Sequence, residues 1–156
     1  MNSFLLTISF FACQLFTSVI STCPTGTAID AYDYCFYPFP DPMTQGEYLQ
    51  TNYEDAKRNC ASSVAGFLQN GLWGSACWFS SQYFNGSFWA GIHKADNGTW
   101  TYSDGAYLDE NNWAYGFPSD DHSCAVANRV GEWESVDCST SHYFLCLIPS
   151  TTNVNK

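Results

Sequence analysis

The clearest pattern along the chain is a run of apolar residues at helical spacing between residues 51 and 67. Apolar side chains recur there every three or four positions, which is typical of a helix that packs one face on a core. These positions are Tyr53, Ala56, Cys60, Val64 and Phe67. Thr51 and Glu54 have the spacing of a capping box, in which both side chains bond to free backbone N–H groups. The sequence therefore predicts a helix over residues 51–67 that is capped at Thr51.

Further along the chain the pattern becomes that of strands. Residues 75–84 are compatible with a second short helix, whereas 87–93 and 98–103 resemble β-strands. Asn97-Gly98 lies between these two strands and is a common sequence for a tight hairpin turn. Three final strands are predicted after a long irregular region, 104–123, and they cover residues 124–128, 130–136 and 143–148. Because helices come early and antiparallel strands late, the expected class is α+β.

The first 21 residues differ from the rest of the chain. No charged residue lies between Phe4 and Ile20, and Val19 and Ser21 are small enough for the −3 and −1 positions of a signal-peptidase site. We expect residues 1–21 to be a cleaved signal peptide and the protein to be secreted. An uncleaved anchor is the alternative, although the apolar run is short for a spanning helix. Residues 150–156 are expected to form a polar C-terminal tail.

The charge of the chain limits its partners. It has 15 acidic and 5 basic residues, with a formal net charge of −10. Such a chain is expected to avoid nucleic acids, polyanions and anionic membrane surfaces, which leaves neutral glycans, proteins and cations. Aromatic residues make up 18% of the chain and charged ones only 13%, so we expect an aromatic core and no extended disorder.

Cysteines are frequent, and their number is odd once the expected signal peptide is removed. Eight cysteines less Cys13 leave seven, so at least one is free or bonded to another chain. Spacing alone does not choose the pairs. No C-x₂-C spacing occurs and no paired histidines follow, so a zinc site is not expected.

Several short motifs, taken in order, resemble the C-type lectin-like domain family. They are YEDAKRNC (53–60), FWAGI (88–92), WTYSDG (100–105), NNW (111–113), CAVAN (124–128), EWESVDC (132–138) and YFLCL (143–147). The resemblance runs from Cys23 to about Ile148, so a domain over residues 22–149 is expected. It implies a disulfide-stapled fold in which two helices flank antiparallel strands and a long irregular loop forms the binding face.

The resemblance also implies which cysteines are paired. In the long form of the domain the pairs correspond to Cys23 with Cys35, Cys60 with Cys146, and Cys124 with Cys138. Cys77 is left over. Cys77 is expected to be a buried thiol, to join two chains in a disulfide-linked homodimer, or to form a mixed disulfide, because an exposed thiol in the secretory pathway is oxidised.

For the sugar-binding members, the resemblance implies a calcium ion at the long loop. Its ligands come from E-P-N or Q-P-D in the loop, from an acid before the third framework cysteine, and from W-N-D before the fourth. The matching positions here are Phe117-Pro118-Ser119, His122 and Trp133-Glu134-Ser135. Calcium takes six to eight oxygen ligands, several of them anionic, whereas phenylalanine offers none and serine one weak neutral oxygen. We therefore expect no required cofactor and no calcium at the usual site.

Acidic residues beside these positions keep an alternative open. Asp120, Asp121 and Glu134, with Asp137 nearby, are candidate ligands of a rearranged and weaker cation site, and a solvated acidic rim is the simpler interpretation. Aromatic faces stack on sugars and anchor protein contacts. The candidate ligand-binding residues are Tyr115, Phe117, Ser119, Asp120, Asp121 and Glu134. For Tyr115 and Phe117, packing within the loop is the alternative.

Two tripeptides are acceptor sequences for N-glycosylation. They are Asn85-Gly86-Ser87 and Asn97-Gly98-Thr99, and both fall at apparent turns. We expect glycans on Asn85 and Asn97; unused acceptor sequences are the alternative.

The function expected from the sequence is extracellular binding without catalysis. The chain resembles a secreted module that recognises a glycan or a protein, and the family resemblance makes host defence a common setting. The two alternatives are a calcium-dependent lectin that uses the rearranged acids and a disulfide-linked structural oligomer. No nucleophile lies in a recognisable catalytic motif, so an enzyme is not expected.

Overall fold

The computed structural model describes most of the expected domain. The described residues are 20–23, 28–29, 34–62, 66–67, 76, 80–108, 111–149 and 151–153. Residues 1–19 of the expected signal peptide, Cys77 and part of the expected tail lie outside them. No helix in the described part is long and apolar enough to cross a membrane.

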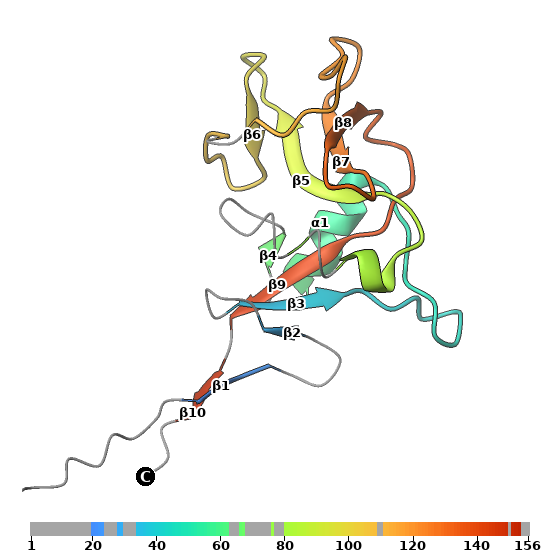
Figure 1. Ribbon diagram of the computed structural model, residues 1–156, viewed down its shortest axis with the longest axis vertical. Helices are drawn as coiled ribbons and strands as arrows, with labels where there is room; N and C mark the ends of the chain where they lie inside the picture. Colours follow the sequence, from blue (N-terminus) through green and yellow to red (C-terminus); the bar gives the residue numbers. More distant parts are fainter. Residues whose placement is uncertain are drawn as a thin grey trace, which may run out of the picture.

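Two antiparallel sheets and a short ladder make up the strands of the described residues (Figure 1). In strand order, the sheet near the chain ends, here the proximal sheet, contains β2 (Ala28–Ile29), β3 (Tyr34–Pro38), β9 (Leu145–Pro149) and β4 (Gly66–Phe67). The distal sheet contains β6 (Trp100–Tyr102), β5 (Phe88–Lys94), β7 (Cys124–Ala127) and β8 (Trp133–Val136). The ladder joins β1 (Ile20–Thr22) to β10 (Thr151–Asn153) at the end of the molecule opposite the distal sheet (Figure 1).

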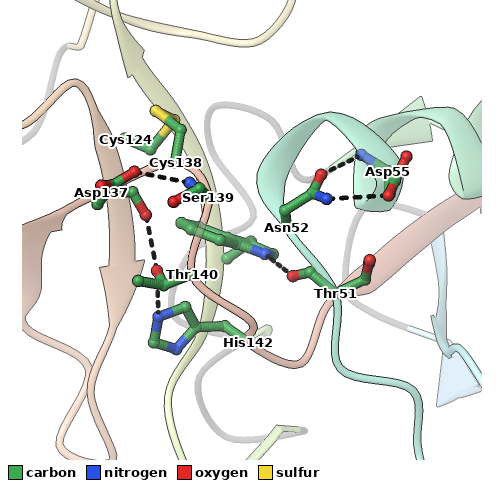
Figure 2. The surroundings of a disulfide bond; sticks show 10 residues. Thr51, Asn52, Asp55, Cys124, Asp137, Cys138, Ser139, Thr140 and His142 are labelled. Carbon is green, nitrogen blue, oxygen red and sulfur yellow. Dashed lines mark hydrogen bonds between the residues drawn. A yellow bond between two sulfur atoms is a disulfide. The ribbon is translucent and has the colours of Figure 1, made fainter.

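The helix α1 (Tyr53–Ser62) begins one residue later than the expected cap implies. The backbone N–H of Asp55 donates to Asn52 Oδ1 at 2.9 Å, and Asn52 Nδ2 donates to Asp55 Oδ2 at 2.9 Å (Figure 2). The expected cap at Thr51 is therefore wrong. Thr51 forms an antiparallel bridge with His142, and its carbonyl accepts a hydrogen bond from Trp89 Nε1 at 2.7 Å. These tertiary contacts hold Thr51 in an extended conformation, so the next residue caps the helix.

The other end of the predicted helix is also shorter than expected. Helix α1 ends at Ser62, and Phe67 belongs to β4, where it pairs with Cys146 of β9. The prediction that Phe67 is helical is therefore wrong, because Gly66 and Phe67 form the edge strand β4 of the proximal sheet. Ala76 and residues 80–83 are helical, which agrees with the short helix expected over 75–84.

The β5–β6 hairpin is confirmed, with a longer turn than the shortest possible. Lys94 pairs with Trp100, the N–H of Ala95 donates to the Thr99 carbonyl, and the N–H of Gly98 donates back to the Ala95 carbonyl, both at 2.8 Å. Gly98 has a φ of +83°, which a residue with a side chain rarely adopts. This is the three-residue hairpin loop that ends in a left-handed glycine.

The buried side chains form two clusters on the two faces of the distal sheet. One cluster joins the distal and proximal sheets through Phe88, Ile92, Tyr102, Trp133 and Leu147. The other joins α1 to both sheets through Tyr53, Cys60, Trp89, Val126 and Cys146. Residues from the early helix and from the last strands therefore pack together in the second cluster.

The three disulfides expected from the family resemblance are all present. They are Cys23–Cys35, Cys60–Cys146 and Cys124–Cys138. Cys60–Cys146 links α1 to β9. Cys124–Cys138 links the start of β7 to the residues that follow β8 (Figure 2). The α+β, disulfide-stapled fold is thus confirmed.

Candidate functional site

The long irregular segment is docked on β8 by backbone hydrogen bonds. The N–H of Trp133 donates to the Asn112 carbonyl at 2.8 Å, and the N–H of Ala114 donates to the Trp133 carbonyl at 2.9 Å. The indole of Trp113 packs edge-to-face on Trp133 and on Trp100, with ring centroids 5.7 and 4.8 Å apart. Trp133 is fully buried. The surface built on this support consists of residues 114–122 and 132–137, and we call it the loop face.

Two aromatic side chains of the loop face differ in exposure. Tyr115 is fully exposed, and Phe117 is 37% exposed. Both lie in a turn closed by the N–H of Phe117, which donates to the Ala114 carbonyl at 3.0 Å. The turn includes Gly116, with a φ of +88°, and is followed by a cis peptide bond between Phe117 and Pro118. Tyr115 is therefore free to contact a ligand without any rearrangement of the core.

Ser135 and Ser119 meet in the middle of the loop face. The backbone N–H of Ser119 donates to Ser135 Oγ at 2.7 Å, and Ser135 is 2% exposed. The serine hydroxyl therefore ties the long loop to β8 with an internal hydrogen bond. Its position corresponds to the acid of the W-N-D motif.

Glu134 is directed to a neighbouring turn. Its Oε1 accepts a hydrogen bond from Asn128 Nδ2 at 2.9 Å, and the same amide lies 3.4 Å from Glu132 Oε2. Asn128 Oδ1 in turn accepts from the backbone N–H groups of Val130 and Glu132. The carboxylate thus supports the 128–131 turn.

Asp120 and Asp121 lie on the exposed rim of the loop face. Asp120 Oδ1 is 3.6 Å from Lys94 Nζ, and the same ammonium donates to the Asp120 carbonyl at 3.4 Å. Lys94 also lies 5.9 Å from the ring centre of Trp100. The N–H of Asp121 donates to Ser119 Oγ at 3.3 Å. The only basic group paired with these acids in the described residues thus comes from the end of β5.

Asp137 shapes the turn after β8. Its Oδ1 accepts from the N–H of Ser139 at 2.8 Å, and its carbonyl accepts from the hydroxyl and the N–H of Thr140 (Figure 2). The hydrogen bonds from Ser139 lower the pKa of the Asp137 carboxyl, and His122 contributes in the same direction. The carboxylate therefore already has donors within its own turn.

The family to which the fold belongs follows from comparison with known proteins. Residues 49–148, most of the chain, match the family described as Lectin C-type domain. The chain belongs to the C-type lectin domain family. This is a non-enzymatic binding fold, which agrees with the expectation that the chain is not an enzyme.

Two relatives share about a quarter of their residues with this C-type lectin domain. Snaclec CHH-B subunit alpha of Crotalus horridus is 27% identical over 128 residues, which are 80% of this chain and 92% of that protein. Lectin BRA-3 of the barnacle Megabalanus rosa is 25% identical over 144 residues, which are 85% and 83% of the two chains.

Solved structures show the same fold at lower identity. The mouse scavenger receptor C-type lectin carbohydrate-recognition domain has a TM-score of 0.69 and 22% identity, covering 83% of this chain and 98% of that one. A calcium-independent type II antifreeze protein has a TM-score of 0.67 and 19% identity, covering 85% and 98%. These similarities establish the fold only. The ligand must be inferred from the residues of the loop face.

The residues of this C-type lectin domain do not fit calcium at the usual position. Phe117 has no side-chain oxygen, Ser135 is bonded to the Ser119 backbone, and Glu134 is bonded to Asn128. In the described part of the chain, no group of three or more His, Cys, Asp or Glu side chains is arranged to hold a metal ion. Calcium needs six to eight converging oxygens, and this arrangement does not supply them.

Two residues of the site were not expected from the sequence. Asn128 organises the turn that holds Glu134, and Lys94 contacts Asp120 across 26 residues of chain. Asn128 is followed by Gly131, with a φ of +92°, so an Asn before a glycine turn was an available signal. Lys94 had no comparable local signal, because its partner is brought to it only by the folded chain.

Proposed function

We propose that this C-type lectin domain is a secreted binding module that recognises an extracellular glycan or protein through the loop face, without calcium at the usual site. The observation that carries the proposal is the hydrogen bond between Ser135 Oγ and the Ser119 N–H. In the sugar-binding members that the sequence resembles, the calcium ligands come from both the long loop and the W-N-D position, which corresponds to β8 here. In this chain a buried hydroxyl links the same two segments, so the loop face is organised before any ion or ligand arrives.

The chemistry of the loop face favours an uncharged or basic ligand. Its exposed aromatic rings, Tyr115 and Phe117, offer flat apolar surfaces, and Asp120 and Asp121 offer hydrogen-bond acceptors beside them. Aromatic rings next to acceptors bind the C–H face and the hydroxyl groups of a sugar, and also anchor protein side chains. The three disulfides suit an oxidising compartment, which supports secretion.

A glycan array, read with calcium and again with a chelator, tests this proposal. We expect the same bound set in both conditions, and we expect the Tyr115→Ala variant to lose at least tenfold in affinity. Met43→Ala is the control, because Met43 is 92% exposed but lies outside the loop face. If no array glycan binds, the unmodified protein and the Tyr115→Ala variant are immobilised. The binding of extracellular proteins to the two is then compared, again with calcium and with a chelator. Binding that disappears with the chelator contradicts the proposal.

Calcium titration separates this proposal from a calcium-dependent lectin built from rearranged acids. Calorimetry is expected to show no calcium bound at micromolar affinity. One ion bound at low-micromolar affinity and lost in both Asp120→Asn and Glu134→Ala variants would establish the alternative. Asp120 is exposed to solvent, whereas Glu134 accepts a hydrogen bond from Asn128 and would have to leave it to bind calcium. Loss of binding in the Glu134 variant therefore shows that the site is rearranged.

A disulfide-linked dimer is a second candidate for the assembled protein. One relative is named as a subunit, snaclec CHH-B subunit alpha, and six of the seven expected mature cysteines are used in the three internal bonds. Cys77 is the one that remains. Peptide mapping without reduction is expected to recover a Cys77–Cys77 peptide, whereas a labelled free Cys77 in a monomer excludes the dimer.

A further inference from the structure

A small cavity lined by tyrosines is formed by residues outside the loop face. Its volume is about 250 Å³, and its described walls include Tyr48, Tyr83, Tyr143, Glu47, Gln50 and Asn85. Tyr48 and Tyr83 are arranged edge-to-face with ring centroids 5.7 Å apart, and Tyr143 stacks on the buried Phe84 at 4.7 Å. We call it the tyrosine pocket. Its walls combine flat aromatic surfaces with carboxylate, amide and phenol groups.

Asn85, one of the two expected glycosylation sites, stands in the wall of this pocket. Its side-chain oxygen accepts a hydrogen bond from the guanidinium of Arg129 at 3.0 Å, and the residue is exposed. The next residue, Gly86, lies so close to Tyr143 that an added Cβ would be 3.3 Å from the ring. The backbone of the acceptor tripeptide thus packs closely on the Tyr143 ring. A second tyrosine of the pocket, Tyr83, precedes Asn85 by two residues.

We propose that Asn85 carries an N-linked glycan whose first N-acetylglucosamine occupies the tyrosine pocket as a built-in ligand. The modification joins Asn85 Nδ2 to C1 of the sugar. The donor is a lipid-pyrophosphate-linked oligosaccharide: its C1–O bond breaks, the lipid pyrophosphate leaves, and Nδ2 loses one proton. The side-chain oxygen of Asn85 is untouched by this exchange, so its hydrogen bond from Arg129 persists and fixes the plane of the amide to which the sugar is attached.

The size of the pocket suits a tethered sugar better than a free ligand. Pockets for free small molecules are usually about 300–1,000 Å³, and this one is smaller. A free sugar would lose translational and rotational freedom on binding, whereas a sugar already attached at Asn85 has lost most of it. One pyranose ring has an apolar C–H face for Tyr83, which is 39% exposed, and hydroxyl and acetamido groups for Glu47 and Gln50.

The second acceptor site provides a matched control within the same chain. Asn97 lies in the turn of the β5–β6 hairpin, where its side-chain oxygen accepts from the N–H of Thr99 at 3.0 Å. Asn97 does not border the tyrosine pocket as the structure describes it. Asn97 instead lines a different cavity together with Thr101 and Tyr107. The Asn97→Gln background removes any glycan from that cavity and isolates the effect of Asn85.

The test measures thermal stability with one sugar and with none. The Asn97→Gln protein is secreted from eukaryotic cells that make only oligomannose glycans, and an endoglycosidase then trims each glycan to a single N-acetylglucosamine. We expect this protein to melt about 3 °C above the same sequence made without glycans. The difference should vanish in the Tyr83→Ala background. Mass spectrometry that finds Asn85 unmodified, or a difference that persists without Tyr83, overturns the proposal.

A direct contact measurement covers the case in which Tyr83→Ala does not fold. In NMR spectra of the trimmed Asn97→Gln protein, nuclear Overhauser effects should connect sugar protons to the Tyr83 and Tyr143 rings, with the sugar signals shifted upfield by the ring currents. A sugar whose signals match those of a free N-acetylglucosaminyl asparagine, without such contacts, overturns the proposal independently of stability.

Discussion

At the scale of single residues, the hydroxyl of Ser135 holds the long loop on strand β8 through its hydrogen bond with Ser119. In a Ser135→Ala variant the N–H of Ser119 loses its acceptor at a half-buried position. An unsatisfied buried donor costs about 1–3 kcal/mol, so we expect a loss of about 1–2 kcal/mol in the free energy of unfolding. Urea unfolding measures it. Ser123→Ala is the control because Ser123 is exposed, and equal stability of the two variants would contradict the assigned hydrogen bond.

His142 links stability to pH. Its Nδ1 lies 2.9 Å from Ser87 Oγ and its Nε2 lies 3.0 Å from Thr140 Oγ1, while its ring packs on the Trp89 indole with centroids 4.8 Å apart. Burial lowers the pKa of His142 below its ordinary value of 6.5. The unfolded chain then takes up the proton more readily than the folded one. The contribution of His142 to stability is therefore complete above about pH 6.5 and is lost as the pH falls through the lowered pKa.

An NMR titration of the imidazole C–H signals checks this prediction. We expect His142 to titrate with a midpoint below 6.5, and we expect the loss of stability between pH 7.5 and 5 to be smaller in a His142→Asn variant. A midpoint at or above 6.5 would show that the charged form is favoured in the folded protein.

The residues of the candidate site were only partly accessible from the sequence. Phe117, Ser119 and Ser135 could be assigned to the positions of the usual calcium ligands because the surrounding motifs keep their order. The hydrogen bond from Ser119 to Ser135 could not be predicted, since its partners are separated by 16 residues and meet only when the loop docks on β8. The tyrosine pocket was missed for the same reason: Tyr48, Tyr83 and Tyr143 come from three distant segments.

At the scale of elements, the start of α1 provides a sharp test of the cap. Asn52→Ala removes the side chain that bonds to the N–H of Asp55, and such a loss typically costs about 1 kcal/mol. Thr51 takes part mainly through its backbone, so Thr51→Ala should cost less than half as much. Chemical denaturation of the two variants measures the difference. A larger loss of stability in Thr51→Ala than in Asn52→Ala would show that Thr51 caps the helix, as the sequence predicted.

Strand β8 gives a second test, because neighbouring residues point in different directions. Trp133 is fully buried, and its truncation to alanine should cost about 3–5 kcal/mol, a large share of the roughly 5–15 kcal/mol that stabilises a small domain. Glu134 is half-buried on the opposite side, and Glu134→Ala should leave a folded protein. Thermal melts compare the two. Similar melting temperatures would show that the register of β8 is wrong.

Elements were predicted well where a local period and a tertiary contact agree. The hairpin of β5 and β6 and the strands β7 to β9 follow alternation and turn residues, both of which are local. The predicted helix was too long at both ends, because Thr51 pairs with His142 and Phe67 pairs with Cys146. Helical spacing alone cannot show where a helix ends because the chain pairs with a strand.

At the scale of the whole molecule, the disulfides should contribute unequally to stability. Cys60 and Cys146 are 86 residues apart, whereas Cys124 and Cys138 are 14 apart. Closing the longer loop restricts the unfolded chain more, so replacing each pair by serine should cost about 4.5 and about 3 kcal/mol, respectively. Equilibrium unfolding of the two double variants measures the order. A costlier loss of the short link would indicate that loop entropy does not dominate here.

The contact of Trp100 with Trp113 and of Trp113 with Trp133 also makes the protein its own optical probe. Three indoles whose centres are 4.8 and 5.7 Å apart couple their electronic transitions, and near-ultraviolet circular dichroism reports such fixed packing. One indole belongs to β6, one to the long loop and one to β8. A ligand that shifts the loop would therefore change the indole bands of this spectrum without any label, and one that contacts only Tyr115 would leave the indole bands intact.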